Sequence, residues 1–167
     1  MENLVFDNIT PSDYEWLNGV NNKSAPAMNE MSMVEMVSLI DRSSVARIAR
    51  VEGDSVGALI AFLPNKNYDS SNYQWFNQNY SDFLYIDRAM VEEDYRGAGI
   101  GKKLYSDTIR VAKELGVSSI TCEVNTKPPN LRSMEFHKRQ GFVLLENRHN
   151  ALDNKHVAML SLPLEVV

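Results

Sequence analysis

The 167-residue chain has few of the residues that mark several protein classes. Its only cysteine is Cys122, which excludes an intramolecular disulfide and a cysteine-based zinc site. Lys and Arg number 17 against 22 Asp and Glu, and a net charge of −5 argues against sequence-independent binding to nucleic acid. The longest nearly unbroken apolar run, residues 56–63, is too short to span a bilayer, and the N-terminus lacks the order of a signal peptide. We therefore expect a cytoplasmic protein with no nucleic-acid or membrane partner.

What is present fits an ordinary globular protein. Apolar residues make up 44% and charged residues 23% of the chain, which excludes wholesale disorder, collagen and a coiled coil. Neither a repeat nor a linker rich in Pro, Gly or Ser appears, so we expect one domain over residues 1–167. The three histidines are scattered without metal-ligand spacing, and we expect no metal site.

Hydrophobic periodicity predicts a mixed α/β (α+β) fold with a parallel pair of strands in the middle of the sheet. The expected strands cover residues 3–9, 45–51, 56–63, 83–91, 117–125, 142–146 and 155–162, and the four expected helices cover about 11–19, 30–41, 99–115 and 129–140. Residues 64–81 have no clear period but hold five of the fifteen aromatic residues, so we expect an ordered, functional loop there.

A glycine-rich segment lies between a buried strand and a strong helix. It reads Arg96, Gly97, Ala98, Gly99, Ile100, Gly101 and Lys102. Glycine allows close approach of the backbone to a ligand, and the start of a helix offers unpaired N–H groups that suit a phosphate or pyrophosphate. A tight strand-to-helix turn is the alternative, although such a turn rarely needs three alternating glycines. The segment satisfies neither the Walker A pattern nor the dinucleotide fingerprint, because Lys102 stands where those motifs need other residues.

Two motifs resemble the GCN5-related N-acetyltransferase (GNAT) superfamily. The first is the family's Arg/Gln-x-x-Gly-x-Gly/Ala signature, matched by Arg96, Gly99 and Gly101. The second is a helix motif, matched by Asn130, Ser133, Phe136, His137, Gly141 and Phe142. The resemblance covers about residues 83–145. Residues 68–76 and 121–125 further resemble a poorly characterised branch of predicted acetyltransferases.

The resemblance implies the GNAT fold and acetyl-coenzyme A as cosubstrate. The fold is a mostly antiparallel seven-stranded sheet with a splayed central parallel pair, and the acetyl-coenzyme A lies in the gap. The implied cofactor-binding residues are Ala89, Met90 and Val91 for the pantetheine, Gly97 to Lys102 with Arg96 for the pyrophosphate, and Asn130 and Ser133 on the following helix. A backbone amide near Met90 or Val91 would hold the thioester oxygen as negative charge develops.

The implied reaction is direct transfer of an acetyl group to an amine, which needs two proton transfers. The family commonly uses a tyrosine as the acid for the departing thiolate, and here that position holds His137. An imidazole titrates near neutrality and suits that task, although packing between helix and sheet is an equal alternative. Candidate bases are Tyr85 and Asp87, with Glu123 on the neighbouring strand as a further candidate. A structural ion pair with Arg88 is the alternative for Asp87.

The acceptor is expected near the aromatic segment. Candidate substrate-binding residues are Tyr68, Asp69, Asn72, Tyr73, Trp75, Arg88 and Asn125. Acids with aromatic rings suit a cationic amine, whereas Arg88 or Arg132 suits a carboxylate, so the identity of this small-molecule or peptide amine stays open. The alternative is that the aromatics simply pin a long loop to the sheet or form a dimer contact, and dimers are frequent in the family.

Two other functions compete with the enzyme. One is a non-catalytic acyl-coenzyme A-binding or regulatory module of the same fold, and the other is an unrelated nucleotide-binding protein with a phosphate loop. Cys122 alternates with Ile120 and Val124 in an apolar strand, so we interpret it as core rather than nucleophile.

Overall fold

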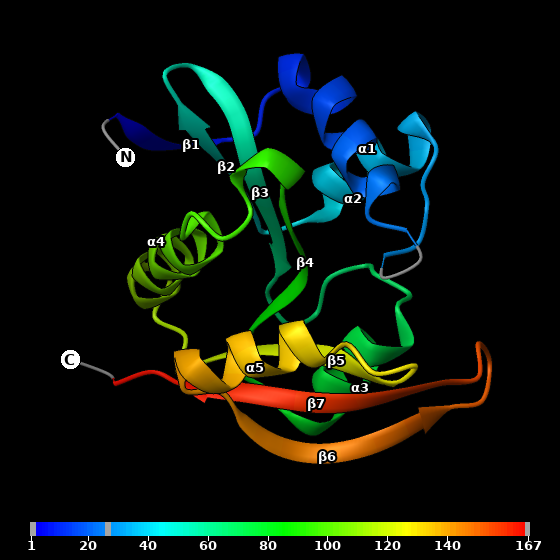
Figure 1. Ribbon diagram of the computed structural model, residues 1–167. Helices are drawn as coiled ribbons and strands as arrows, with labels where there is room; N and C mark the ends of the chain where they lie inside the picture. The colour runs from blue at the N-terminus through cyan, green and yellow to red at the C-terminus, as the bar shows by residue number, and fades with distance from the viewer. Residues whose placement is uncertain (1–2, 26–27, 166–167) are drawn as a thin grey trace. The chain divides into compact units, whose positions relative to one another are not determined.

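The computed structural model describes residues 3–25 and 28–165 and shows a seven-stranded mixed sheet (Figure 1). The strands are β1 (Leu4–Asn8), β2 (Val45–Val51), β3 (Asp54–Phe62), β4 (Leu84–Val91), β5 (Ser119–Lys127), β6 (Val143–Asn150) and β7 (Lys155–Pro163). Their order is β1-β2-β3-β4-β5-β7-β6, with β4 parallel to β5 through Leu84–Ile120 and Tyr85–Thr121. Antiparallel pairing joins β1 to β2, β2 to β3, β5 to β7 and β7 to β6. The expected fold class is confirmed.

Helices number five within the described residues rather than the four expected. They are α1 (Tyr14–Lys23), α2 (Met33–Arg42), α3 (Ser71–Asn79), α4 (Ile100–Glu114) and α5 (Leu131–Gln140), with 3₁₀ turns at Pro11–Asp13 and Glu93–Tyr95. The additional helix, α3, lies in the segment expected to be a loop. The first helix also runs past its expected end at Gly19 to Lys23, since a glycine inside a helix weakens it without ending it.

The chain forms two compact units. One contains the residues up to Phe62 together with Ile86–Val111, and the other contains Leu63–Tyr85 and Ala112–Val167. The first unit therefore holds β1, β2 and β3, and the second holds β5, β6 and β7. The expectation of one domain over residues 1–167 stays a prediction.

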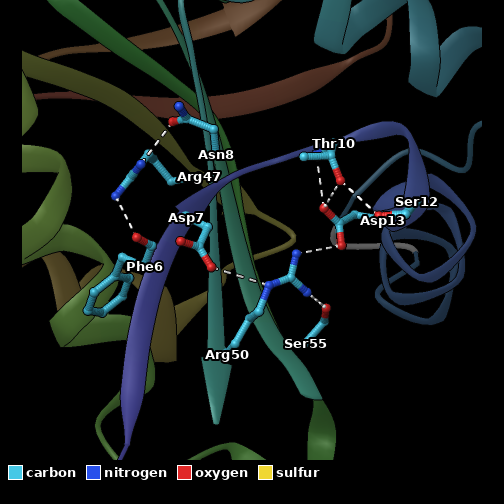
Figure 2. Close-up of polar contacts among 9 residues, drawn as sticks. All are labelled: Phe6, Asp7, Asn8, Thr10, Ser12, Asp13, Arg47, Arg50 and Ser55. Atoms are coloured by element: carbon cyan, nitrogen blue, oxygen red, sulfur yellow. Dashed lines mark hydrogen bonds and ion pairs between the residues drawn. The ribbon is translucent and has the colours of Figure 1, made fainter. Parts of the chain in front are cut away.

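Arg50 on β2 organises the polar edge of the first unit (Figure 2). Its Nη2 donates to Asp13 Oδ1 at 2.7 Å, its Nη1 donates to Ser55 Oγ at 2.7 Å, and its Nε lies 3.5 Å from Asp7 Oδ2. Burial alone would raise the pKa of Asp13, but hydrogen bonds from Thr10 and Arg50 outweigh it and lower that pKa. The charged form of Asp13 is thus the one that the fold stabilises.

Arg47, also on β2, reaches α4 and β1. Its Nε donates to Asp107 Oδ2 at 2.7 Å, while Nη1 donates to Asn8 Oδ1 and Nη2 to the Phe6 carbonyl (Figure 2 shows the contacts with β1). The Asp107 side chain is only 6% exposed, and Arg110 donates to its other oxygen. Two guanidinium groups outweigh the effect of burial and lower the pKa of Asp107.

Gly57 on β3 lets α4 pack closely. A Cβ at this position would lie 2.9 Å from Leu104 Cδ1, 3.0 Å from Ile100 Cγ2 and 3.1 Å from the Met90 carbonyl oxygen. A larger residue would require the Leu104 or Ile100 side chain, or the backbone at Met90, to move. The glycine therefore allows the first turns of α4 to pack closely against β3.

The second unit has an aromatic core built around α3. Tyr73 and Phe76 of α3 are fully buried, and each lies 5.5–5.6 Å from the ring of Tyr85 on β4. The Tyr73 hydroxyl donates to the Leu63 carbonyl at 2.7 Å and accepts from Lys66 N–H. Burial raises the pKa of Tyr73. This tyrosine therefore ties the segment before α3 to the helix itself.

Candidate active site

The glycine-rich loop of the first unit needs glycine for its backbone rather than for space. Gly97 and Gly99 have φ angles of 82° and 84°, a region that residues with a Cβ rarely adopt. A Cβ at either position would meet no atom within 4 Å, so the loop leaves open space beside its backbone. Lys103 N–H donates to the Gly99 carbonyl and begins α4, and the N–H groups before it have no intrahelical acceptor. These groups fit a pyrophosphate.

The end of β4 leads into this loop. Met90 is buried at 2% exposure, Ala89 and Val91 are half-buried, and Arg96 is exposed. Arg96 Nε donates to the Val91 carbonyl at 3.3 Å, which ties the loop back to the strand. The residues expected to hold pantetheine and pyrophosphate are thus consecutive parts of one unit.

Two candidate bases meet in the second unit. The Tyr85 hydroxyl on β4 donates to Glu123 Oε2 on β5 at 2.7 Å. Tyr85 is fully buried between the rings of α3, whereas Glu123 is half-buried. A hydrogen bond from a fixed phenol holds the carboxylate in one orientation and stabilises its charged form. The pair presents an anchored carboxylate that has access to solvent.

The other candidate base, Asp87, is in an ion pair. Arg88 Nε donates to Asp87 Oδ2 at 2.7 Å, and the two side chains are 9% and 5% exposed. Arg88 Nη1 also donates to Asn21 Oδ1 at 2.6 Å and lies 3.4 Å from Met31 Sδ. This arrangement is the structural pairing given above as the alternative, and it links β4 to α1 and the segment after it.

Helix α5 contains the remaining predicted cofactor residues and the predicted acid. Asn130 is its N-cap, with Oδ1 accepting from Ser133 N–H at 3.1 Å, and its own N–H donates to the Asn125 carbonyl. His137 is 6% exposed, with Phe136 and Phe142 edge-on to its ring at 5.3 and 5.0 Å. Its Nδ1 donates to the Ser133 carbonyl at 2.7 Å. Burial lowers the pKa of His137 despite that hydrogen bond, so the imidazole is neutral at pH 7.

Five of the seven predicted acceptor residues lie on and before α3, whereas Arg88 lies on β4 and Asn125 on β5. Tyr68 and Tyr73 are buried, Asp69 is exposed, and Asn72 keeps its Oδ1 buried without a hydrogen-bond partner among the described residues. Trp75 is half-buried beneath the Arg148 guanidinium, which lies 5.4 Å from the ring centroid. The aromatic rings pin α3 to its own unit, and Trp75 with Asn72 are the half-buried members of the set.

Two polar residues on these elements have roles that sequence reasoning missed. Asn21 is fully buried and accepts from Arg88, although the sequence placed it beyond the end of the first helix. Its spacing from Leu17 and Val20, both buried on α1, was the available signal. Arg148, which covers Trp75, follows the end expected for its strand, so no pattern pointed to it.

The Cys122 thiol is a poor candidate for a nucleophile at this site. Burial, together with the charge of Glu123, raises the pKa of the Cys122 thiol, which is 3% exposed. Over residues 3–25 and 28–165, no group of three or more His, Cys, Asp and Glu has an arrangement that could hold a metal ion. None of the helices described there is long and apolar enough to cross a membrane.

Residues 14–142 match the acetyltransferase (GNAT) family. The chain belongs to this family. It is accordingly an acyltransferase that uses acetyl-coenzyme A as cosubstrate. A comparison with curated protein sequences found no match to this acetyltransferase.

Solved structures share the fold of the acetyltransferase at low sequence identity. The ribosomal-protein-S18-alanine N-acetyltransferase from Escherichia coli has a TM-score of 0.77 and 15% identity, covering 99% of this chain and 96% of its own. Ard1 from Thermoplasma volcanium has a TM-score of 0.78 and 18% identity, covering 97% and 98%. Arabidopsis thaliana NAA60 in complex with acetyl-CoA has a TM-score of 0.74 and 20% identity, covering 97% and 100%.

Proposed function

We propose that this acetyltransferase transfers the acetyl group of acetyl-coenzyme A directly to the amine of a peptide or small molecule, with Glu123 as the general base. The observation that carries the proposal is the 2.7 Å hydrogen bond from buried Tyr85 to Glu123. It fixes a carboxylate on the strand beside β4 without removing it from solvent. Such a group can take the proton that an ammonium must lose before it attacks.

The chain's residues have separate tasks in this proposal. Bound acetyl-coenzyme A supplies an activated acetyl thioester. The N–H groups of Gly97 and of Gly99 to Lys102 hold the pyrophosphate, whereas the Ala98 N–H donates to the Tyr95 carbonyl at 3.3 Å. The backbone of Ala89 to Val91 pairs with the pantetheine. Asn130, the N-cap of α5, and Ser133 in the first turn are the proposed contacts of that helix with the cosubstrate.

Proton transfer balances the reaction. Glu123 takes the first proton of the ammonium, directly or through water, and releases it to solvent. The amine nitrogen then forms a bond to the acetyl carbon, the carbon–sulfur bond breaks, and the nitrogen loses its second proton to solvent, from which the proton donor to the thiolate is recharged. The leaving thiolate takes up one proton, for which His137 is the proposed donor. Because the pKa of His137 is lowered, only a minor protonated fraction performs this step at pH 7.

For the acceptor we propose a peptide amine as the first class to test. Two solved structures of the same fold support this choice: one is a ribosomal-protein-S18-alanine N-acetyltransferase, and the other is a NatC complex bound to a Gag peptide and CoA. The acceptor contacts that we propose are Asp69, Asn72 and Trp75 in and before α3, together with Asn125. Cytoplasmic location and a homodimer also stay predictions; the mass of the protein in solution tests the second.

Thermal unfolding with and without acetyl-coenzyme A tests the loop. Ligand at a hundred times its dissociation constant should add about 2.7 kcal/mol of stability to the wild type. Gly99→Glu should lose that shift because it places a negative side chain and a strained backbone in the pyrophosphate site. Gly53→Glu is the matched control, since Gly53 also has a positive φ, 93°, and open space but lies in the β2–β3 turn. Equal shifts in all three proteins would overturn the assignment of the loop.

An acetyl-transfer assay over peptides and small amines tests the base. Glu123→Gln keeps the shape and a hydrogen-bond acceptor for Tyr85 but cannot take up the amine proton, so we expect turnover to fall by about a hundredfold. Retained binding of acetyl-coenzyme A in this variant shows that the loss is chemical. Binding without transfer in the wild type, over the whole panel, would instead favour a non-catalytic coenzyme-binding module.

A further inference from the structure

Three basic side chains form a row across the ends of three neighbouring strands. Lys127 on β5 is directly opposite His156 on β7, and His156 is directly opposite His149 on β6. Residues opposite each other on adjacent strands point to the same face of a sheet. The row therefore brings together side chains from three strands, in a chain whose net charge is −5.

The two histidines are stacked. Their ring centroids are 4.3 Å apart with an angle of 16° between planes, and His149 Nε2 donates to Asn154 Oδ1 at 2.8 Å. His149 and Lys127 are exposed and His156 is half-buried, so an ion in solvent can reach all three. Nearly parallel rings direct their nitrogen lone pairs alongside each other rather than toward one point, which does not suit a shared metal ion.

The charges in the row act against one another. The pKa of His156 is lowered by desolvation and by the positive charges of His149 and Lys127. The adjoining β6–β7 turn contributes Asp153 and Lys155, and Asp153 Oδ1 accepts from Lys155 N–H within that turn. Helix α3, to which Asn150 is bound through Ser71, contains no charged residue. An anion bound over the row would relieve the repulsion between its members.

We propose that Lys127, His156 and His149 form a proton-coupled binding site for a phosphate or carboxylate group. Protonation of the two imidazoles creates the full positive charge, and the bound anion in turn favours protonation. The site is assigned independently of the acetyl-transfer proposal. The anion comes either from a separate small molecule or from a phosphate of the coenzyme.

Histidine NMR titrations test this site, with sulfate as the probe because it stays a dianion over the whole range of pH. The chain has three histidines, and His149→Asn and His156→Asn assign their resonances. At constant ionic strength, replacing chloride by sulfate should raise the apparent pKa of His156 by about half a unit, a roughly threefold change in proton affinity. The buried His137 should not respond.

The variant Lys127→Ala distinguishes anion binding at the row from nonspecific screening of charge by the salt. This variant should raise the pKa of His156 in chloride and reduce its response to sulfate, whereas Lys113→Ala, which removes an exposed lysine from α4, should behave as the wild type. Equal pKa values in sulfate and chloride would overturn the proposal. So would binding of Zn²⁺ to the histidine pair without any response to sulfate.

Two coenzymes identify the source of the anion. Acetyl-coenzyme A that shifts both histidine resonances, with no shift from its analogue lacking the 3′-phosphate, assigns that phosphate to the row. A response to sulfate with none to either coenzyme assigns the site to a separate anion. Both results support the row as an anion site, and thermal unfolding of the glycine-loop variants reports on the acetyl-transfer proposal separately.

Discussion

At the scale of single residues, the two side chains in the contact between Tyr85 and Glu123 have different proposed roles. Tyr85 is the positioning residue and Glu123 is the base. Tyr85 is fully buried, so its phenol is a poor candidate for exchanging protons with an acceptor in solvent, whereas Glu123 is half-buried. The hydrogen bond holds the carboxylate in one orientation. Its removal should therefore leave the base in place but less well oriented.

Tyr85→Phe tests this division of roles. The variant keeps the ring contacts with Tyr73 and Phe76 and removes only the hydroxyl. We expect turnover to fall by about tenfold, less than for Glu123→Gln, with the affinity for acetyl-coenzyme A unchanged. Equal losses of turnover and of affinity would show that Tyr85 acts only in packing.

His137→Ala tests the proposed acid. Turnover should fall more than affinity for acetyl-coenzyme A, because the imidazole acts on the leaving thiolate and not on the bound coenzyme. In the wild type the same role predicts that turnover declines as pH rises through a value below 6.5, since burial lowers the pKa of His137. Unchanged turnover and affinity in the variant would remove His137 from the reaction.

At the scale of elements, Asp107 on α4 forms one buried ion pair, with Arg47 on β2, and one exposed ion pair, with Arg110. The buried pair should contribute more to the free energy of unfolding. Arg47 and Arg110 both bind Asp107, but their side chains are 12% and 53% exposed. Arg47→Ala leaves a buried carboxylate with one exposed partner and should cost about 3 kcal/mol, whereas Arg110→Ala should cost about 0–1 kcal/mol. Urea denaturation measures both; equal losses would contradict the argument from burial.

Sequence patterns predicted the elements whose apolar residues follow one period. The strand that becomes β2 and the helix that becomes α4 were predicted within a residue, because each has one clear apolar face. Helix α3 was missed because its nine residues are mostly polar and its buried residues, Tyr73 and Phe76, are too few to show a period. The N-cap at Ser70, which accepts from Tyr73 N–H, was the remaining signal.

The sequence predicted the residues of the candidate site only where a backbone conformation or a family motif determines them. Gly97 and Gly99 have the positive φ angles that a loop of this type requires. The sequence did not predict which side chains form hydrogen bonds with each other. Tyr85 and Glu123 were separate candidates, and the parallel pairing of β4 and β5 brings them together. Asp87 likewise has its partner in the next residue, a pairing that the sequence suggested without deciding it.

At the scale of the whole molecule, three groups that titrate below pH 7 act in one direction. The pKa values of Asp13, Asp107 and His137 are all lowered by folding, so in acid these groups bind more protons in the unfolded chain than in the folded chain. The contribution of His137 to stability is fully present at pH 7, above the ordinary histidine value of 6.5, and is lost below that value as the unfolded histidine becomes protonated. The carboxylates add a second loss as pH falls below 3.8 and through their folded values.

Urea midpoints measured against pH should therefore decline in two steps. His137→Ala should flatten the upper step, and Asp107→Asn should flatten the lower one while lowering stability at pH 7. A midpoint that rises on acidification between pH 6.5 and 3.8 would contradict the direction assigned to His137.

The burial of Cys122 has a practical consequence for studying the enzyme. It is the only thiol in the chain, it is 3% exposed, and its pKa is raised, so the folded protein contributes almost no reactive thiolate. A chromogenic disulfide reagent will then report the coenzyme thiol released at each turnover with little background. The same property makes any cysteine introduced on the surface, such as Asp153→Cys in the exposed β6–β7 turn, a unique attachment point for a fluorophore.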